Sequence, residues 1–181
     1  MNVAYQYNPW TELPHGVELV KLSTHTDDRG SFTELLRKNW LPSFEPTQTN
    51  YARSEENVLR GVHLHKSHSD FLIFVEGVAV VALRDLRKKS PTYFNGGLYE
   101  FTSKNLQGIF IPPGVAHGFY FPQGGAHIYM VDKYFDGSDE FGCAYNDPAL
   151  ELNWPTIAPK LSPRDKSLGT LTELITQIES W

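Results

Sequence analysis

The chain has 181 residues, of which 40% are hydrophobic and 13% aromatic. This composition excludes a disordered chain and is sufficient for one globular domain spanning residues 1–181. The formal net charge of −5 and a pI near 5.8 argue against nucleic acid as a partner, because phosphate-backbone binding needs a basic face.

The sequence also indicates a compartment. Met1–Trp10 lacks the basic start and apolar centre of a signal peptide. The most apolar stretch, Phe71–Leu83, is interrupted by Glu76 and Gly77 and is too short to span a membrane. Cys143 is the only cysteine, so no internal disulfide can form. We therefore expect a cytoplasmic protein without membrane contacts.

Short segments rich in β-branched and aromatic residues alternate with turn residues along most of the chain. Val17–Leu22 alternates as a half-buried strand does, Asp27–Gly30 is a turn signal, and Phe32–Leu36 is predicted as a strand or a short helix. Further strands are predicted at Phe71–Val75, Val78–Leu83, Tyr93–Phe101, Gly108–Ile111, Gly118–Phe121 and His127–Tyr134. This spacing predicts a mainly β fold, an antiparallel jelly roll or barrel of the cupin type.

The carboxyl-terminal segment has a different pattern. Ser162 is a good helix cap, Pro163 suits the first turn, and Asp165 would lie near the positive end of the helix dipole. Apolar residues then recur every three to four positions, at Leu168, Leu171, Ile175 and Ile178. We predict one amphipathic helix that begins near Ser162 and closes the domain.

Two segments, Asn57–His65 and Ile111–Phe119, each place a histidine just past a glycine-bearing turn. The histidines, His63 and His117, would project into the mouth of a small antiparallel barrel. A protected histidine is a natural general base at neutral pH. We therefore expect a pocket at this end of the fold.

These segments, with several others, resemble the signature of the nucleotide-sugar 3,5-epimerases, cupin-fold enzymes that act on dTDP-4-keto-6-deoxyhexoses. The matching elements are the D-x-R-G-x-F element around Arg29 with Glu34 following, Gln48–Asn50 (Q-x-N), Asn57–His63 (N-V-L-R-G-x-H), Asp85–Thr92 (D-x-R-x-x-S-P-T), Pro113–Phe119 (x-G-x-A-H-G-F), Asn146–Ala149 (N-D-x-A), Trp154-Pro155 (W-P) and Leu161–Asp165 (L-S-x-x-D). Each element alone is weak, but their order and spacing together are highly specific.

The resemblance implies an isomerase that inverts carbon 3, carbon 5 or both of a nucleotide-linked 4-keto-6-deoxyhexose, without a cofactor, in the synthesis of deoxysugar precursors such as dTDP-rhamnose for lipopolysaccharide. Removing a proton beside a ketone needs a positioned base and a way to stabilise the enolate. By resemblance, His63 is the base and Asp165 orients its ring. Tyr129 would return the proton on the opposite face.

The resemblance also implies how the substrate is held. Arg60 and Arg29 would bind the diphosphate in forked contacts, and Tyr134 would stack on the nucleotide base. The full set of implied substrate-binding residues is Arg29, Phe32, Glu34, Gln48, Asn50, Arg60, His117, Tyr134 and Arg164. A homodimer is implied, in which the segment from Arg29 to Glu34 reaches the pocket of the neighbouring subunit.

The residues alone leave other interpretations open. Arg29 in a polar turn is more often a solvated charge, and Tyr129 fits a buried structural tyrosine equally well. Asp165 fits a helix-capping acid, a role compatible with orienting His63. Phe32 and Trp154 are expected in the core on any interpretation.

One position departs from the family pattern. Asp70 stands where the family usually has a lysine near the keto oxygen, and a carboxylate would repel an oxyanion. With His65 replacing the usual glutamine, the set His63, His65, Asp70 and His117 is similar to the three histidines and one carboxylate of metal cupins. Two alternatives therefore remain, a metal-dependent cupin enzyme and a catalytically silent sugar-nucleotide binder. The intact catalytic residues favour the epimerase over the silent binder.

Overall fold

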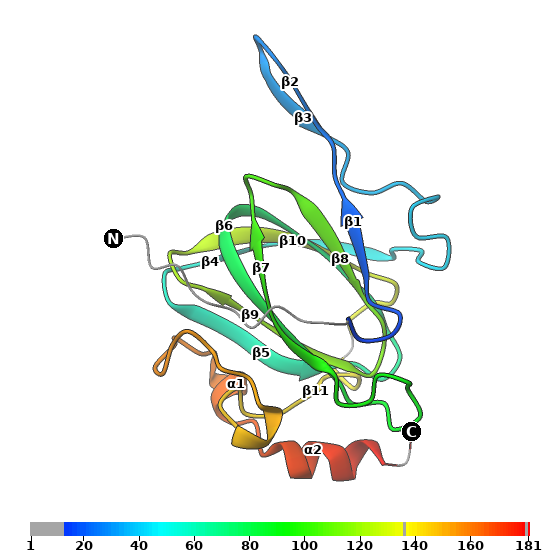
Figure 1. Cartoon of the computed structure of the whole chain (residues 1–181), viewed down its shortest axis with the longest axis vertical. Coiled ribbons are helices and arrows are strands. Elements are labelled where there is room, and N and C mark those ends of the chain that lie inside the picture. The colour runs from blue at the N-terminus through cyan, green and yellow to red at the C-terminus, as the bar shows by residue number, and fades with distance from the viewer. Residues whose placement is uncertain (1–12, 136, 180) are drawn as a thin grey trace.

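The computed structural model describes residues 13–135, 137–179 and 181, and its main body is an antiparallel barrel (Figure 1). The strands are β1 (Glu18–Lys21), β2 (Thr24–Asp27), β3 (Gly30–Thr33), β4 (Gln48–Ser54), β5 (Val58–Leu64), β6 (Asp70–Asp85), β7 (Gly96–Thr102), β8 (Gln107–Ile111), β9 (Val115–Phe121), β10 (Gly125–Val131) and β11 (Phe141–Gly142). A 3₁₀ turn at Pro148–Leu150 and two helices, α1 (Pro163–Lys166) and α2 (Leu171–Ile178), follow. The prediction of a mainly β jelly roll with a carboxyl-terminal helix is confirmed.

The long strand β6 joins the two halves of the barrel. Its first half pairs with β8 and β10, and its second half, from Val78 onward, pairs with β7 and β9. The two strands predicted at Phe71–Val75 and Val78–Leu83 are therefore one continuous strand. Gly77 lies at the change of partners with a φ of +77°, and a Cβ there would come within 2.5 Å of the carbonyl oxygen of Gly124. A glycine is needed at this position because any side chain would collide with that backbone.

Aromatic and branched side chains fill the barrel interior. Phe74, Val81, Ile109, Phe119 and Phe121 are all buried and belong to one core cluster. Their alternation along the strands puts them on the inner face. Phe119 also borders the cavity described below, so this core forms part of the cavity wall.

The carboxyl-terminal helix begins near Ser162 as predicted, but the described residues form two helices there instead of one continuous helix. Ser162 caps α1 as expected, but α1 ends at Lys166. A second cap at Thr170 begins α2, where the side chains of Thr170 and Glu173 reciprocally bond the backbone N–H groups. The apolar face of α2 packs on the outer side of β5 and β11, so both helices cover this wall of the barrel (Figure 1).

The hairpin of β2 and β3 projects away from the barrel (Figure 1). Phe32 on β3 is 65% exposed, so the expectation that it belongs to the core is wrong for a single chain. Trp154 is partly buried against the core and donates its indole N–H to the carbonyl of Tyr145, at 3.0 Å.

The glycine before His63 forms no turn, contrary to the sequence interpretation. Gly61 lies inside β5, where the pairing with β9 shifts register between Arg60 and His63. A Cβ at Gly61 would lie 2.7 Å from the Cα of Gly118. The absent side chain lets β5 and β9 approach closely, and the irregular register sets the direction of His63. None of the helices in the described ranges is long and apolar enough to cross a membrane.

Candidate active site

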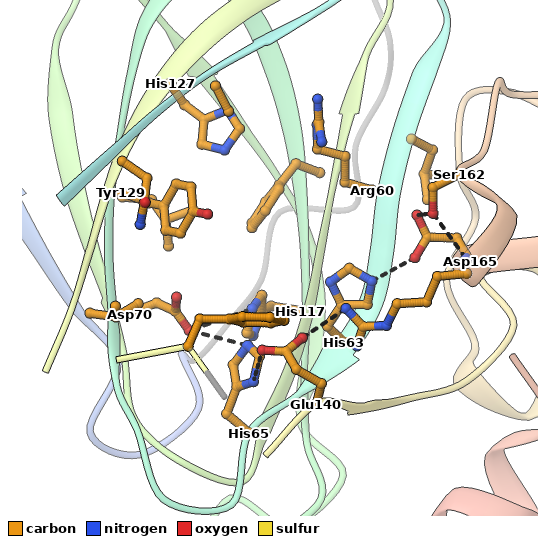
Figure 2. A pocket seen from close by; sticks show the side chains of 18 of the residues that line it. Arg60, His63, His65, Asp70, His117, His127, Tyr129, Glu140, Ser162 and Asp165 are labelled. Atoms are coloured by element: carbon orange, nitrogen blue, oxygen red, sulfur yellow. Dashed lines mark hydrogen bonds and ion pairs between the residues drawn. The ribbon is translucent and has the colours of Figure 1, made fainter. Parts of the chain in front are cut away.

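One end of the barrel contains a cavity of about 490 Å³ (Figure 2). Strands β4, β5, β6, β9 and β10 supply most of its wall, and the loop after β10 and the start of α1 complete it. This volume is in the range of small-molecule sites, roughly 300–1,000 Å³. The cavity therefore has room for part or all of a nucleotide-linked sugar.

His63 and Asp165 meet at one wall of this cavity. His63 lies on β5, and its Nε2 is 2.6 Å from Oδ1 of Asp165. Ser162, the cap of α1, donates its hydroxyl to Oδ2 of Asp165 at 2.8 Å and accepts from the Asp165 backbone N–H. Burial alone would raise the pKa of Asp165, but the hydrogen bonds from His63 and Ser162 hold it below its ordinary value. Asp165 thus lies in the first turn of α1, behind the Ser162 cap, and its carboxylate is the partner of the histidine.

The hydrogen bond also fixes the tautomer of His63. An ionised Asp165 accepts the proton on Nε2, which leaves Nδ1 to take a proton from another molecule. The side chain of His63 is 18% exposed, whereas that of Asp165 is 4% exposed. The histidine is therefore reachable from the cavity, and its orienting carboxylate is shielded from water.

Tyr129 projects into the cavity from β10, on the side opposite His63 (Figure 2). Its backbone pairs with Asn50 of β4 and Leu72 of β6, so strands on both sides hold it. Burial raises the pKa of Tyr129, and the nearby acids Asp70 and Glu140 add to this rise. The phenol therefore keeps its proton at neutral pH and is able to donate it.

Basic and amide groups line the rest of the wall. Arg60 donates from Nε to the Ser54 hydroxyl and from Nη2 to the Arg53 carbonyl, both at 3.0 Å, which anchors its guanidinium at the cavity. Gln48 donates to Oδ1 of Asn50 at 2.8 Å. Lys133, Lys160 and Arg164 add further positive groups to the lining. Such a concentration of cations suits a phosphorylated ligand.

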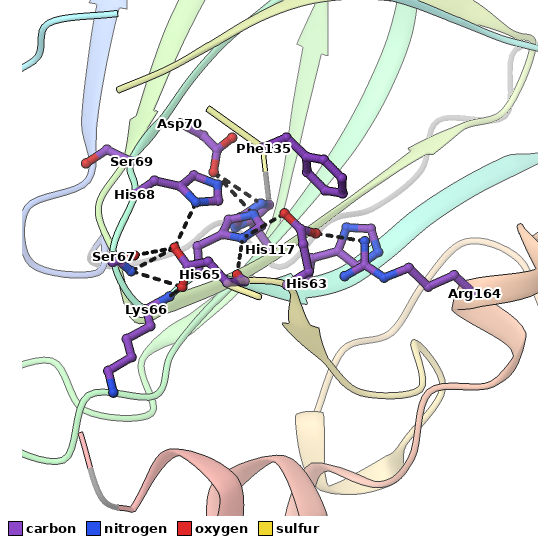
Figure 3. Close-up of polar contacts among 12 residues, drawn as sticks. His63, His65, Lys66, Ser67, His68, Ser69, Asp70, His117, Phe135 and Arg164 are labelled. Atoms are coloured by element: carbon purple, nitrogen blue, oxygen red, sulfur yellow. Dashed lines mark hydrogen bonds and ion pairs between the residues drawn. The ribbon is translucent and has the colours of Figure 1, made fainter. Parts of the chain in front are cut away.

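A cluster of histidines and acids occupies the end of the cavity nearest the loop after β5 (Figure 3). Nε2 of His65 lies 3.5 Å, and Nε2 of His117 lies 3.7 Å, from the same Oδ2 of Asp70. Burial lowers the pKa of His65 to about 4, and that of His117 well below its ordinary value. Burial raises the pKa of Asp70 well above its ordinary value, with further contributions from nearby acids. Burial therefore opposes an uncompensated negative charge on Asp70.

The set of four residues suggested by the metal-cupin pattern is not brought together as a whole. His65, Asp70 and His117 place their ligand atoms within 4.8 Å of one another. His63 stands apart from this group, because its Nε2 is bonded to Asp165.

Four of the other predicted binding residues lie outside the cavity of a single chain. Arg29 is on the projecting hairpin, where its side chain is 86% exposed and forms an ion pair with Asp27. Phe32 is on the same hairpin, and Glu34 just beyond it pairs with Arg37 at 2.6 Å. Tyr134 is 72% exposed and does not contribute to the lining.

Several lining residues were missed by sequence reasoning. Phe135, next to Tyr134, lines the cavity, and its backbone N–H donates to Gln48 at 3.4 Å. Glu140 lines it too and pairs with Arg164 at 2.7 Å. Both lie in the irregular loop after β10, where no periodic pattern marks which side chains point inward. His127 could have been found, because it alternates with Tyr129 on one strand and therefore shares its face.

Comparison with known proteins identifies the family of this chain. The sequence model of dTDP-4-dehydrorhamnose 3,5-epimerase matches residues 11–173. The chain is 35% identical over 150 residues to the spore coat polysaccharide biosynthesis protein SpsL of Bacillus subtilis, covering 78% of this chain and 96% of that protein. It is 32% identical to a dTDP-4-dehydrorhamnose 3,5-epimerase of Neisseria gonorrhoeae over 86% of this chain, although the match spans 49% of that longer protein.

A solved structure agrees with the sequence matches. The dTDP-4-dehydrorhamnose 3,5-epimerase of Bacillus anthracis, with TDP and PPi bound, superposes with a TM-score of 0.81 at 30% identity, covering 90% of this chain and 98% of that one. The resemblance found in the sequence is therefore confirmed, and so is the prediction of an isomerase. The chain belongs to the dTDP-4-dehydrorhamnose 3,5-epimerase family.

Proposed function

We propose that this protein inverts carbon 3, carbon 5 or both of a nucleotide-linked 4-keto-6-deoxyhexose by removing a proton and returning it on the opposite face. The observation that carries the proposal is the 2.6 Å contact between His63 and Asp165 at one wall of the cavity, with Tyr129 at the facing wall. A base and an acid on opposite sides of a bound ring are what an inversion needs.

The reaction balances without a change of oxidation state. Nδ1 of His63 takes the proton from the carbon beside the ketone, the C–H electron pair forms a carbon–carbon double bond, and the carbonyl pair moves onto oxygen. Asp165 stabilises the resulting imidazolium. Tyr129 then donates its phenolic proton to the other face, and the oxygen charge returns to the carbonyl. Proton exchange with water restores both side chains.

The cavity is suited to a diphosphate. Arg60 is held at its wall by two hydrogen bonds, and Lys160 and Lys133 lie on the same lining. The related Bacillus anthracis enzyme was solved with TDP, which supports a dTDP-linked substrate here. Phe135 lines the cavity and offers an aromatic face for the nucleotide base. Tyr134, to which the resemblance gives this role, is the preceding residue and is exposed in the single chain.

We further propose a cytoplasmic homodimer in which the hairpin of β2 and β3 completes the pocket of the second subunit. The support for this proposal is the exposure of the hairpin to solvent in the single chain. Each residue of β2 is exposed, and Phe32 presents a large apolar surface to solvent in the single chain. Arg29, at the hairpin turn, would then add a cation to the partner's diphosphate site.

The test is hydrogen exchange in deuterated water with dTDP-4-keto-6-deoxyglucose, read by NMR. We expect deuterium at carbon 3, carbon 5 or both, and none with His63→Ala. His15→Ala is the matched control, because His15 is exposed and lies outside the cavity. A wild-type protein that exchanges no carbon-bound hydrogen with this or other nucleotide-4-keto-6-deoxyhexoses would contradict the proposal.

A further inference from the structure

The side chains of His65, Asp70 and His117 converge at one buried point. Both histidine Nε2 atoms face Oδ2 of Asp70, at 3.5 and 3.7 Å, and the three side chains are only 4–8% exposed. His117 comes from β9, Asp70 begins β6, and His65 directly follows β5. The three positions are therefore held by neighbouring strands rather than by one flexible loop (Figures 2 and 3).

The backbone fixes the protonation of both rings. Nδ1 of His65 lies 3.0 Å from the carbonyl oxygen of Asp139, and Nδ1 of His117 lies 3.1 Å from that of Val115. A carbonyl oxygen only accepts, so each Nδ1 carries the proton and each Nε2 presents a lone pair. The depressed pKa values of both rings agree with this neutral form.

Oδ2 of Asp70 lacks a hydrogen-bond partner within the described part of the chain. Two imidazole lone pairs and one carboxyl oxygen thus face one another in a buried site. A buried acceptor without a donor, such as Oδ2 of Asp70, is costly, and a cation between this oxygen and the two lone pairs would satisfy it. Histidines whose second nitrogen donates to a backbone carbonyl are the usual arrangement around bound metals.

We propose that His65, Asp70 and His117 bind one divalent transition-metal ion, and that this ion holds the keto oxygen of the substrate. Two imidazole nitrogens and one carboxylate oxygen are suitable ligands for Zn²⁺, Fe²⁺, Co²⁺ or Mn²⁺. All three residues line the cavity, so the remaining coordination positions face the space that a substrate would occupy. The role in catalysis rests on the proposed epimerase function, whereas the binding site does not.

A second group, His65, His68 and Glu140, also has its ligand atoms within 4.8 Å. Its members are already engaged. Nδ1 of His68 bonds Oδ2 of Asp139 at 2.9 Å, and Glu140 forms an ion pair with Arg164 at 2.7 Å. The group around Asp70 is therefore the better metal site, because among the residues that the structure describes its three facing atoms have no competing partner of opposite charge.

The ion would lie beside the proposed base. His117 and His63 occupy facing positions on β9 and β5. When His63 takes the proton, the electron pair released moves to the keto oxygen, and a divalent cation there stabilises the negative charge as a Lewis acid. This arrangement accounts for catalysis without an ammonium group at position 70.

The first test measures binding without activity. The full chain, purified without a polyhistidine tag and stripped with a chelator, is titrated with Zn²⁺ by calorimetry and with Co²⁺ by visible absorption. We expect one ion per chain, and at least tenfold weaker binding in Asp70→Asn and in His65→Gln, with folding checked by circular dichroism. His68→Gln, which removes a residue of the second group but keeps all three proposed ligands, should bind as the wild type does. No stoichiometric ion, or an equal loss in His68→Gln and Asp70→Asn, overturns the proposed site.

The second test measures whether the metal ion takes part in catalysis. After the metal has been removed with a chelator, the rate of deuterium exchange into the substrate should fall at least tenfold. Adding back the ion that binds most tightly should restore this rate. Exchange that continues unchanged after complete metal removal would overturn the metal's role while leaving the proposed epimerase function intact. A wild-type protein that holds one ion but exchanges no substrate hydrogen supports the site and contradicts the epimerase function instead.

Discussion

His63 and His117 face each other in register across β5 and β9, yet their Nε2 atoms meet carboxyl groups of opposite character. Nε2 of His63 lies 2.6 Å from Asp165, whose pKa is held below its ordinary value, because hydrogen bonds outweigh the opposing effect of burial. Nε2 of His117 lies 3.7 Å from Asp70, whose pKa burial raises well above its ordinary value. Two adjacent histidines therefore have different tasks. The first is supported to become an imidazolium, and the second stays neutral.

Replacing the orienting carboxylate tests the first of these tasks. In Asp165→Asn, His63 loses the charge that stabilises its imidazolium, and the amide can select the wrong tautomer. We expect kcat for epimerisation to fall by about 10²–10⁴-fold, the usual contribution of general acid–base catalysis. Ser162→Ala, which removes one hydrogen bond to Asp165 but keeps its charge, should have a much smaller effect. Equal rates in Asp165→Asn and the wild type would contradict the assignment.

The phenol on the opposite wall is tested by separating the two proton transfers. Tyr129→Phe keeps the ring against its neighbours but removes the hydroxyl. We expect deuterium to enter the substrate, because His63 still removes and returns a proton on its own face, while inversion is blocked. NMR of the recovered sugar reads label and configuration together. Inversion at the wild-type rate would show that another group donates the proton.

Arg60 is expected to hold the diphosphate. Arg60→Ala should weaken substrate binding by about 1.5–3 kcal/mol, the usual contribution of a charge-assisted hydrogen bond. Arg53→Ala is the matched control, because Arg53 is a neighbouring arginine whose guanidinium pairs with exposed Glu76 at 2.8 Å instead of lining the cavity. Calorimetry with dTDP measures both variants. Similar losses in the two variants would mean that only the net charge matters.

Local patterns predicted strands in the regions of β1 and of β6 to β10, because the period of alternating side chains survives folding. They did not predict β2, β4 or β5, although β5 carries His63. They predicted one helix where Gly169 and the cap at Thr170 make two, since the apolar period of α2 continues back to Leu168. The pair His63 and Asp165, 102 positions apart, was found only through a motif. Glu140 could not be predicted at all, because an irregular loop positions it and no periodicity records its direction.

If the projecting hairpin forms the dimer interface, a substitution in it should change the oligomeric state. If β2 and β3 pack against a second subunit, Phe32→Asp places a charge in an apolar contact and should shift a wild-type dimer to a monomer at micromolar concentration. Light scattering measures the mass directly. Ile157→Asp is the control, because Ile157 is 96% exposed but lies far along the chain from the hairpin. A wild-type monomer, or a dimer unaffected by Phe32→Asp, would remove the hairpin from the interface.

His127 predicts how stability responds to acid. Its ring stacks on Phe121 and Tyr129, with centroids 5.7 Å away in each case, and its Nδ1 is buried without a hydrogen-bond partner among the residues that the structure describes. Burial lowers its pKa from 6.5 to about 4, and the charge of Arg60 contributes. The unfolded chain therefore binds a proton at this histidine below pH 6.5, whereas the folded chain binds it only near pH 4.

The free energy of unfolding should therefore fall as the pH drops from 6.5 towards 4, with a contribution from His127 on the order of 3 kcal/mol, since each pKa unit corresponds to about 1.4 kcal/mol. His127→Phe cannot take up the proton, so the variant should lose less stability than the wild type across this window. Urea denaturation at several pH values measures the difference. His15→Phe, at an exposed position, should follow the wild-type curve. If the free energy of unfolding of His127→Phe and of the wild type changed with pH in the same way, His127 would have the same pKa in the folded and the unfolded chain. That result would contradict the prediction.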